Sequence, residues 1–152
     1  MQKEAKIKGG FTMRKAFICP TKYVQGEDEI LNLGYFVRTF GTSALLIAHP
    51  DDVKRVKEKL EKTAEKFDVT FVESHFNGEC TRQETVRLSN LAVEKGCSCT
   101  IGLGGGKAID TAKCVAQGEN LIIVPTIAAT DAPTSHSAVL YTPDGGFDDY
   151  AY

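Results

Sequence analysis

Three consecutive glycines at positions 104–106 separate an apolar segment from an amphipathic one, and charged residues follow them. Glycine lets the backbone turn sharply and approach a ligand without an intervening Cβ. A helix that begins at such a turn directs unpaired N–H groups toward a bound phosphate. Lys107, Asp110 and Lys113 share one face of that helix near its N-terminal end, because they are three residues apart. The stretch predicts a nucleotide-binding turn, and a strand-to-helix turn that uses glycine only for packing is the alternative.

A second polar segment, residues 125–135, is rich in hydroxyl groups and small side chains and contains one carboxylate, Asp131. It follows an apolar run that is typical of a buried strand. Ligands of open α/β sheets lie beyond the carboxyl ends of the strands, so we expect this segment beside the glycine turn. Asp131 either faces a ligand there or bonds to nearby backbone amides within a capped loop.

Strand-like and helix-like segments alternate along the rest of the chain. This order predicts an α/β fold, a Rossmann-like doubly wound parallel sheet, with a C-terminal hairpin. The first predicted strand begins at Ala16, and the other four cover residues 44–48, 69–72, 98–103 and 121–125. The predicted helices cover residues 27–40, 51–67, Thr81 to near Gly96, and 106–117. The predicted hairpin joins residues 139–141 to residues 147–150 through a turn at residues 143–146.

Local signals support three of these helices. Apolar residues recur at helical spacing in 27–40, which ends at a C-cap glycine, Gly41. Residues 51–67 form an amphipathic pattern with lysines and glutamates on the outer face. Thr81 and Glu84 have the spacing of a capping box.

Composition excludes several classes of protein. In 152 residues, 42% are hydrophobic and 25% charged, which is typical of a globular domain, and the net charge of −2 gives no electrostatic basis for binding nucleic acid. No apolar run approaches a membrane span or a signal peptide, which predicts a cytoplasmic protein without a membrane partner. The five cysteines are scattered and are expected to be reduced, and Cys97 and Cys99 lack the second ligand pair of a zinc site.

Residues 1–12 are polar and lysine-rich, and we predict that they are a non-native or flexible extension. Codons for Lys8, Gly9 and Gly10 can form a purine run like a bacterial ribosome-binding sequence, which makes Met13 rather than Met1 the expected natural start. The dinucleotide-binding domain is then expected to cover residues 13–152.

Several motifs in unbroken order resemble the glycerol dehydrogenases of the metal-dependent, so-called iron-containing alcohol dehydrogenase superfamily. The motifs are Tyr23-Val-Gln-Gly26, Gly78-Glu-Cys80, Gly104-Gly-Gly-Lys-Ala-Ile-Asp-Thr-Ala-Lys113, Val124-Pro-Thr-Ile127, Thr130-Asp-Ala-Pro133 and Tyr141. The resemblance covers residues 13–152. This stretch is similar only to the N-terminal, nucleotide-binding domain of a two-domain enzyme.

The resemblance implies oxidation of glycerol to dihydroxyacetone with NAD, in a homo-oligomer. It assigns Asp131 to the hydroxyls of a polyol substrate. The positions that it assigns to the cofactor are His49, Gly104, Gly105, Gly106, Lys107, Asp110, Thr126, Ala129, Ser135, Ser137 and Tyr141.

Some of these positions depart from the family pattern. His49 stands where the family has an acidic residue for the adenosine ribose, and an imidazole cannot accept the paired hydroxyl bonds that a carboxylate accepts. Weaker NAD binding, or tolerance of a 2′-phosphate, is the hypothesis that follows. Ala129 stands where a serine is usual, and His136 with Ser137 where small and leucine-like residues are usual.

The resemblance also implies a catalytic zinc, held by an aspartate and two histidines of a C-terminal helical domain. No position up to Tyr152, the last residue, matches those ligands, so the resemblance implies that they lie beyond Tyr152. We therefore expect a truncated enzyme with no metal site, no catalytic residue and no activity of its own. A non-catalytic dinucleotide-binding module is one alternative function. Another polyol or sugar-phosphate dehydrogenase of the superfamily is a second.

Overall fold

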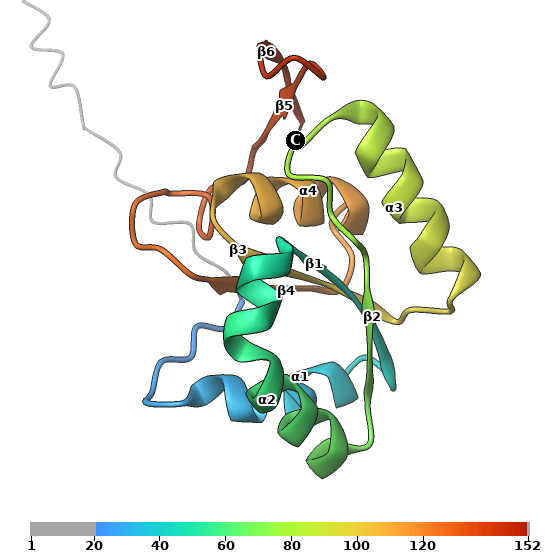
Figure 1. Cartoon of the computed structure of the whole chain (residues 1–152), viewed down its shortest axis with the longest axis vertical. Coiled ribbons are helices and arrows are strands. Elements are labelled where there is room, and N and C mark those ends of the chain that lie inside the picture. Colours follow the sequence, from blue (N-terminus) through green and yellow to red (C-terminus); the bar gives the residue numbers. More distant parts are fainter. Residues whose placement is uncertain (1–20, 152) are drawn as a thin grey trace, which may run out of the picture.

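A four-stranded parallel sheet forms the centre of the computed structural model, which describes residues 21–151 (Figure 1). The strand order is β2-β1-β3-β4, and all pairs within the sheet are parallel. The strands are β1 (Ser43–Ala48), β2 (Thr70–Glu73), β3 (Cys99–Gly104) and β4 (Leu121–Pro125).

Some predictions concern positions outside the described residues. They are the extension at residues 1–12, the start at Met13 and the strand predicted to begin at Ala16. Tyr152, beyond which the metal ligands are expected, also lies outside them, so the described part of the predicted domain ends at Ala151 rather than at Tyr152. These expectations stay predictions.

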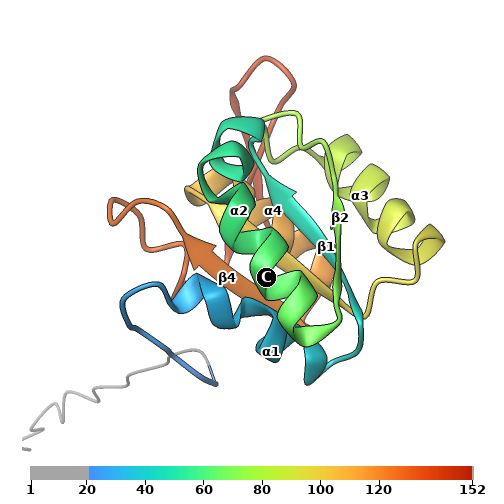
Figure 2. The same cartoon turned by 60° about the horizontal axis from the view of Figure 1, so that its bottom comes forward.

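Helices cover both faces of this sheet, which confirms the predicted doubly wound α/β fold. One face packs against η1 (Glu29–Asn32), α1 (Leu33–Arg38) and α2 (Pro50–Phe67), and the other against α3 (Arg82–Glu94) and α4 (Gly106–Ala116). Figure 2 shows α1 and α2 in front of the sheet. None of the helices in residues 21–151 is both long and apolar enough to cross a membrane.

Strand β1 shows why both faces are covered. Leu46 and Ala48 belong to the core under α1 and α2, whereas Leu45 and Ile47 belong to the core under α3 and α4. Successive side chains of a strand point to opposite faces, so a continuous apolar run needs a hydrophobic partner on each side. The predicted buried parallel strand is therefore confirmed.

The chain reverses its direction across the sheet between β1 and β3. From β1 it moves outward through α2 to β2, and then returns through α3 to β3 on the other side of β1. The segments that leave β1 and β3 therefore go to opposite faces, and in open α/β sheets this arrangement leaves a crevice at the carboxyl ends of the two strands. This switch point is where open α/β sheets bind ligands.

Two local predictions need correction. Residues 27–40 do not form one helix, because η1 is a 3₁₀ turn and α1 ends at Arg38, before the predicted end at Phe40. The capping box is only half present: the Thr81 hydroxyl accepts the Glu84 N–H at 3.1 Å, but the Glu84 carboxylate turns away to Arg87 and to the Asn77 N–H. A buried charge on Glu84 is better satisfied by a guanidinium than by one backbone amide.

The predicted C-terminal hairpin is confirmed. Strands β5 (Ala138–Tyr141) and β6 (Phe147–Ala151) pair in antiparallel fashion and project beyond α4 (Figure 1). Arg82, at the start of α3, holds β6 through ion pairs to Asp148 at 2.9 Å and Asp149 at 2.7 Å. These ion pairs hold the hairpin against the N-terminal end of α3.

Candidate functional site

The glycine turn contains two different kinds of glycine. Gly104 has φ +150°, and a Cβ there would lie 3.0 Å from the Ala108 Cβ, so the fold itself requires glycine. Gly105 has an ordinary φ of −87°, and a Cβ there would meet only the Ile127 side chain, at 3.6 Å. Packing therefore explains Gly104 but not Gly105, which favours close approach of a ligand at the second position.

Helix α4 begins at this turn without a side-chain cap. By contrast, His49 caps α2 and Thr81 caps α3. The first N–H groups of a helix have no intrahelical partner, so those of α4 remain available, and with the helix dipole they attract an anion. This end of α4 fits a pyrophosphate group.

A cavity of about 350 Å³ adjoins the first turn of α4. It lies between α4, the loop after β4 and the hairpin. Seven of the predicted site residues line it, namely Gly106, Lys107, Asp110, Asp131, Ser135, Ser137 and Tyr141, and the remaining lining residues are Thr130, Ala132, Val139 and Tyr150. The structure thus brings three separate stretches of the sequence around one space.

Asp110 and Lys113 join α4 to the wall of this cavity. The Asp110 carboxylate accepts the Val139 N–H at 3.1 Å, and the Lys113 ammonium lies 3.4 Å from it. Lys113 also donates to the Ser135 hydroxyl at 2.9 Å and to the Ser137 carbonyl at 3.0 Å. Burial raises the pKa of Asp110, and the Val139 N–H and Lys113 oppose that rise only in part.

The raised pKa predicts a pH effect on stability. Folded Asp110 keeps its proton above the ordinary aspartate pKa of about 3.9, so the folded state binds more protons there, and its contribution to stability falls as the pH rises toward the folded pKa. Asp110→Asn keeps an acceptor for Val139 without this titration. We expect urea unfolding between about pH 3.5 and 7 to show the variant gaining stability relative to the wild type as the pH rises. A difference that does not change with pH would contradict the assignment.

Lys107 is held at the cavity edge by two partners. Its ammonium pairs with the Glu79 carboxylate and lies 5.7 Å from the centroid of the Tyr141 ring. Half of the lysine side chain remains exposed. The position beside the first turn of α4 suits a contact with a phosphate oxygen, because Lys binds phosphate as a point charge.

The Asp131 carboxylate accepts no hydrogen bond from any residue in 21–151. The loop is closed by other atoms: the Asp131 carbonyl accepts the N–H groups of Thr134 and Ser135, each at 2.9 Å, and the Thr130 hydroxyl accepts the Ala132 N–H. The capped-loop alternative for the Asp131 side chain is therefore wrong. Asp131 lines the cavity, and its carboxylate has no hydrogen-bond partner among residues 21–151.

Five predicted positions do not line the cavity: His49, Gly104, Gly105, Thr126 and Ala129. Gly104 ends β3 and Thr126 follows β4, and the Thr126 N–H donates to the Gly104 carbonyl at 3.0 Å. The pairing of Ala48 with Leu103 places His49 beside Gly104 at the neighbouring strand end. The His49 Nδ1 accepts the Asp51 N–H at 3.3 Å, so part of its role is to cap α2.

Sequence reasoning missed the supporting residues. Glu79 fixes Lys107, and Tyr150 lines the cavity from β6. The sequence pattern predicts the helix face of Lys113 but not its contacts with Ser135 and Ser137. Glu79 belongs to the Gly78-Glu-Cys80 motif, so the resemblance could have indicated it. Nothing in the sequence indicates that the hairpin brings Tyr150 to the cavity beside α4.

The Cys97 and Cys99 thiols are poorly suited to bind a metal ion. Burial raises the pKa of Cys97 and raises that of Cys99 to about 11, which disfavours the thiolates that bind metals. Within residues 21–151, no three His, Cys, Asp or Glu side chains are grouped as metal ligands.

A doubly wound sheet with an uncapped glycine turn at its switch point is the arrangement of dinucleotide-binding α/β proteins. The profile of the iron-containing alcohol dehydrogenase family matches residues 20–152, and the chain belongs to this family. The resemblance inferred from the motifs is thereby confirmed.

Individual relatives show what portion of such proteins the chain represents. It is 41% identical over 140 residues to a glycerol dehydrogenase of Pseudomonas putida, covering 91% of this chain and 38% of that enzyme. It is 36% identical over 142 residues to a glycolaldehyde reductase of Halobacterium salinarum, covering 92% and 39%. The crystal structure of glycerol dehydrogenase from Schizosaccharomyces pombe superposes with a TM-score of 0.78 at 32% identity, over 91% of this chain and 36% of that one. The chain therefore spans less than two fifths of the length of these relatives.

Proposed function

We propose that this chain is the dinucleotide-binding portion of an NAD-dependent oxidoreductase that acts on glycerol. The observation that carries the proposal is the uncapped, sterically open end of α4 at Gly105 beside the cavity that contains Asp131. An anion-binding helix end and an unpaired carboxylate are the two groups that a dinucleotide and a polyol require. Identity to a glycerol dehydrogenase supports the choice of substrate.

Each residue then has a physical role. The N–H groups at the start of α4 and the Lys107 ammonium hold the pyrophosphate of the dinucleotide. Asp131 accepts hydrogen bonds from substrate hydroxyls. The hydrogen bonds from Lys113 to Ser135 and Ser137 hold the loop that contains Asp131 in place. The chemistry that NAD would supply when bound is acceptance of a hydride from the alcohol carbon; with release of the hydroxyl proton to solvent, glycerol would become dihydroxyacetone.

The described residues do not fit a catalytic zinc, since they contain no group of three suitable ligands. We propose that the metal ligands lie beyond Tyr152, in a polypeptide region outside this sequence. Catalysis then needs that region, whereas cofactor binding does not.

The test combines two measurements on the purified chain. We expect calorimetric titration with NAD to show binding, and an assay with glycerol, NAD and added zinc to form no NADH. Absence of NAD binding would contradict the proposed function. NADH formation would instead show that residues of this chain hold the metal.

Reduction of a small hydroxyaldehyde is a second candidate. Identity to a glycolaldehyde reductase is nearly as high as identity to the glycerol dehydrogenase. Asp131 accepts hydrogen bonds from either substrate in the same way. With the complete enzyme, comparison of kcat/KM for glycerol and glycolaldehyde distinguishes the two.

A further inference from the structure

Two cysteines that are far apart in the sequence meet in the fold. The thiols of Cys80 and Cys114 are hydrogen-bonded to each other, and the Cys80 thiol is also hydrogen-bonded to the Thr111 side chain. Thr111 and Cys114 are three residues apart on α4 and therefore share one face of that helix. Cys80, which directly precedes the Thr81 cap of α3, thus packs its sulfur onto α4. Both cysteines are reduced in this structure.

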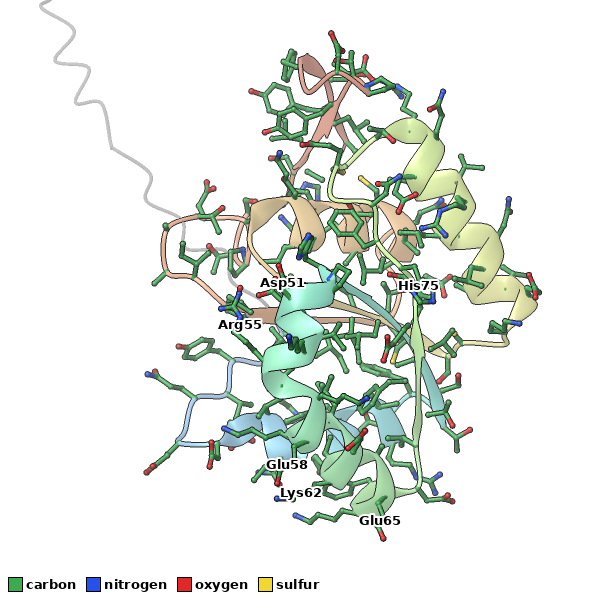
Figure 3. The ribbon with its side chains drawn as sticks, in the orientation of Figure 1. Asp51, Arg55, Glu58, Lys62, Glu65 and His75 are labelled. Carbon is green, nitrogen blue, oxygen red and sulfur yellow. The ribbon has the colours of Figure 1, made fainter. Side chains whose placement is uncertain are left out.

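The thiol pair lies where three elements meet. Helix α4 packs against both α3 and β5, and Figure 3 shows side chains filling the space between the start of α3, the hairpin and α4. The Cys80 carbonyl accepts the Tyr141 N–H of β5 at 2.8 Å. The residue before it, Glu79, pairs with Lys107 of α4. A covalent bond from Cys80 to Cys114 would therefore fasten α3, α4 and the hairpin at one point.

The two thiols differ in reactivity. Cys114 is partly exposed, and the hydrogen bond that it accepts from Cys80 lowers its pKa. Burial and Asp110 oppose this effect, whereas the charges of Lys113 and Arg82 support it. Cys80 is fully buried, and its hydrogen bond to Cys114 together with burial raises its pKa. Because the thiolate is the nucleophile of disulfide exchange, Cys114 is the thiol that reacts first.

Cys97 and Cys99 do not form a comparable pair. Cys97 packs against the core under α3 and α4, whereas Cys99 belongs to the core under α1 and α2, on the opposite face of the sheet. The Cys97 sulfur instead accepts a hydrogen bond from the Ser43 hydroxyl at 3.8 Å. Cys97 is therefore a suitable control position.

We propose that Cys80 and Cys114 are a modification site, at which a low-molecular-weight disulfide converts the thiol pair into a reversible intramolecular disulfide. The Cys114 thiolate attacks one sulfur of the small disulfide and releases a small thiolate, which accepts the proton of Cys80. The Cys80 sulfur then attacks the Cys114 sulfur and releases the second small thiolate, which takes up the proton that Cys114 had lost. Two protein thiols are oxidised, and one small disulfide is reduced to two thiols. This inference does not depend on the proposed function.

The test is oxidation of the purified native chain in buffers with graded ratios of oxidised to reduced glutathione. After alkylation of the remaining thiols, peptide mass spectrometry identifies the linked cysteines. We expect a bond between Cys80 and Cys114 that is lost again in excess reduced glutathione. Cys114→Ser should form no such bond, and Cys97→Ser should behave as the wild type does. The peptide map of the wild type identifies the bond directly, whether or not a variant folds.

Unfolding by urea supplies a second measurement. The disulfide would close a loop of roughly 35 residues and restrict the unfolded chain. We therefore expect the urea midpoint of the wild type to rise by about 1 M on oxidation, and that of Cys114→Ser to stay unchanged. Free thiols at both positions, a bond between other cysteines, lasting glutathione adducts in place of the disulfide, or an unchanged wild-type midpoint would overturn the proposal.

Discussion

Gly104→Ala should destabilise the chain by about 3 kcal/mol, because two costs combine. The variant alanine would have to adopt φ +150°, a conformation that only glycine adopts readily, at a cost of about 1–3 kcal/mol. Its Cβ would also lie 3.0 Å from the Ala108 Cβ and 3.3 Å from the Asp52 carboxylate, and overpacking adds a similar amount. A shift of the urea midpoint with an unchanged slope measures the loss.

Gly105→Ala is the matched control for that variant. Its φ of −87° suits alanine, and the new methyl group would have room. We expect its stability to remain within about 0.5 kcal/mol of the wild type. If both variants lost stability equally, the distinction between the two glycines would be wrong.

The second large effect is expected at the buried carboxylate of Glu84. Arg87 binds it through two hydrogen bonds of 2.7 Å, and the Asn77 N–H adds one of 3.2 Å, while Glu84 itself is 2% exposed. Arg87→Met would leave a buried charge with one backbone partner, which should cost about 3 kcal/mol of unfolding free energy.

A second substitution separates lost charge pairing from lost packing. Addition of Glu84→Gln to Arg87→Met removes the unpaired charge and should restore part of the stability, a coupling that a double-mutant cycle measures. No recovery would show that the cost comes from other contacts of Arg87, such as its bond to the Ser74 carbonyl at 3.1 Å.

The sequence predicted the strands and the long helices because their patterns are local. The apolar run of β1 and the amphipathic pattern of α2 each specify an element and its buried face. The broken helix at residues 27–40 was not predictable in the same way. Its Phe40 fits the helical spacing, yet it lies beyond the end of α1 and is 41% exposed.

The candidate site shows the same division. The glycine turn and the Lys107, Asp110 and Lys113 row follow from spacing on one helix. Contacts between distant segments cannot be predicted from local spacing. Asp110 and Val139, which are hydrogen-bonded, are 29 residues apart in the sequence, and Lys107 and Glu79, which form an ion pair, are 28 residues apart. Only the fold shows that His49 caps α2 and that Ser74 is buried without a partner.

The most direct test of the account is calorimetric titration of NADH into the wild-type chain and into Gly105→Ala. We predict that the wild type binds and that the variant, with an unchanged urea midpoint, binds at least about tenfold more weakly, because its methyl group keeps the pyrophosphate from the backbone. Equal binding by the two proteins, or no binding by the wild type, would contradict a dinucleotide site at the start of α4.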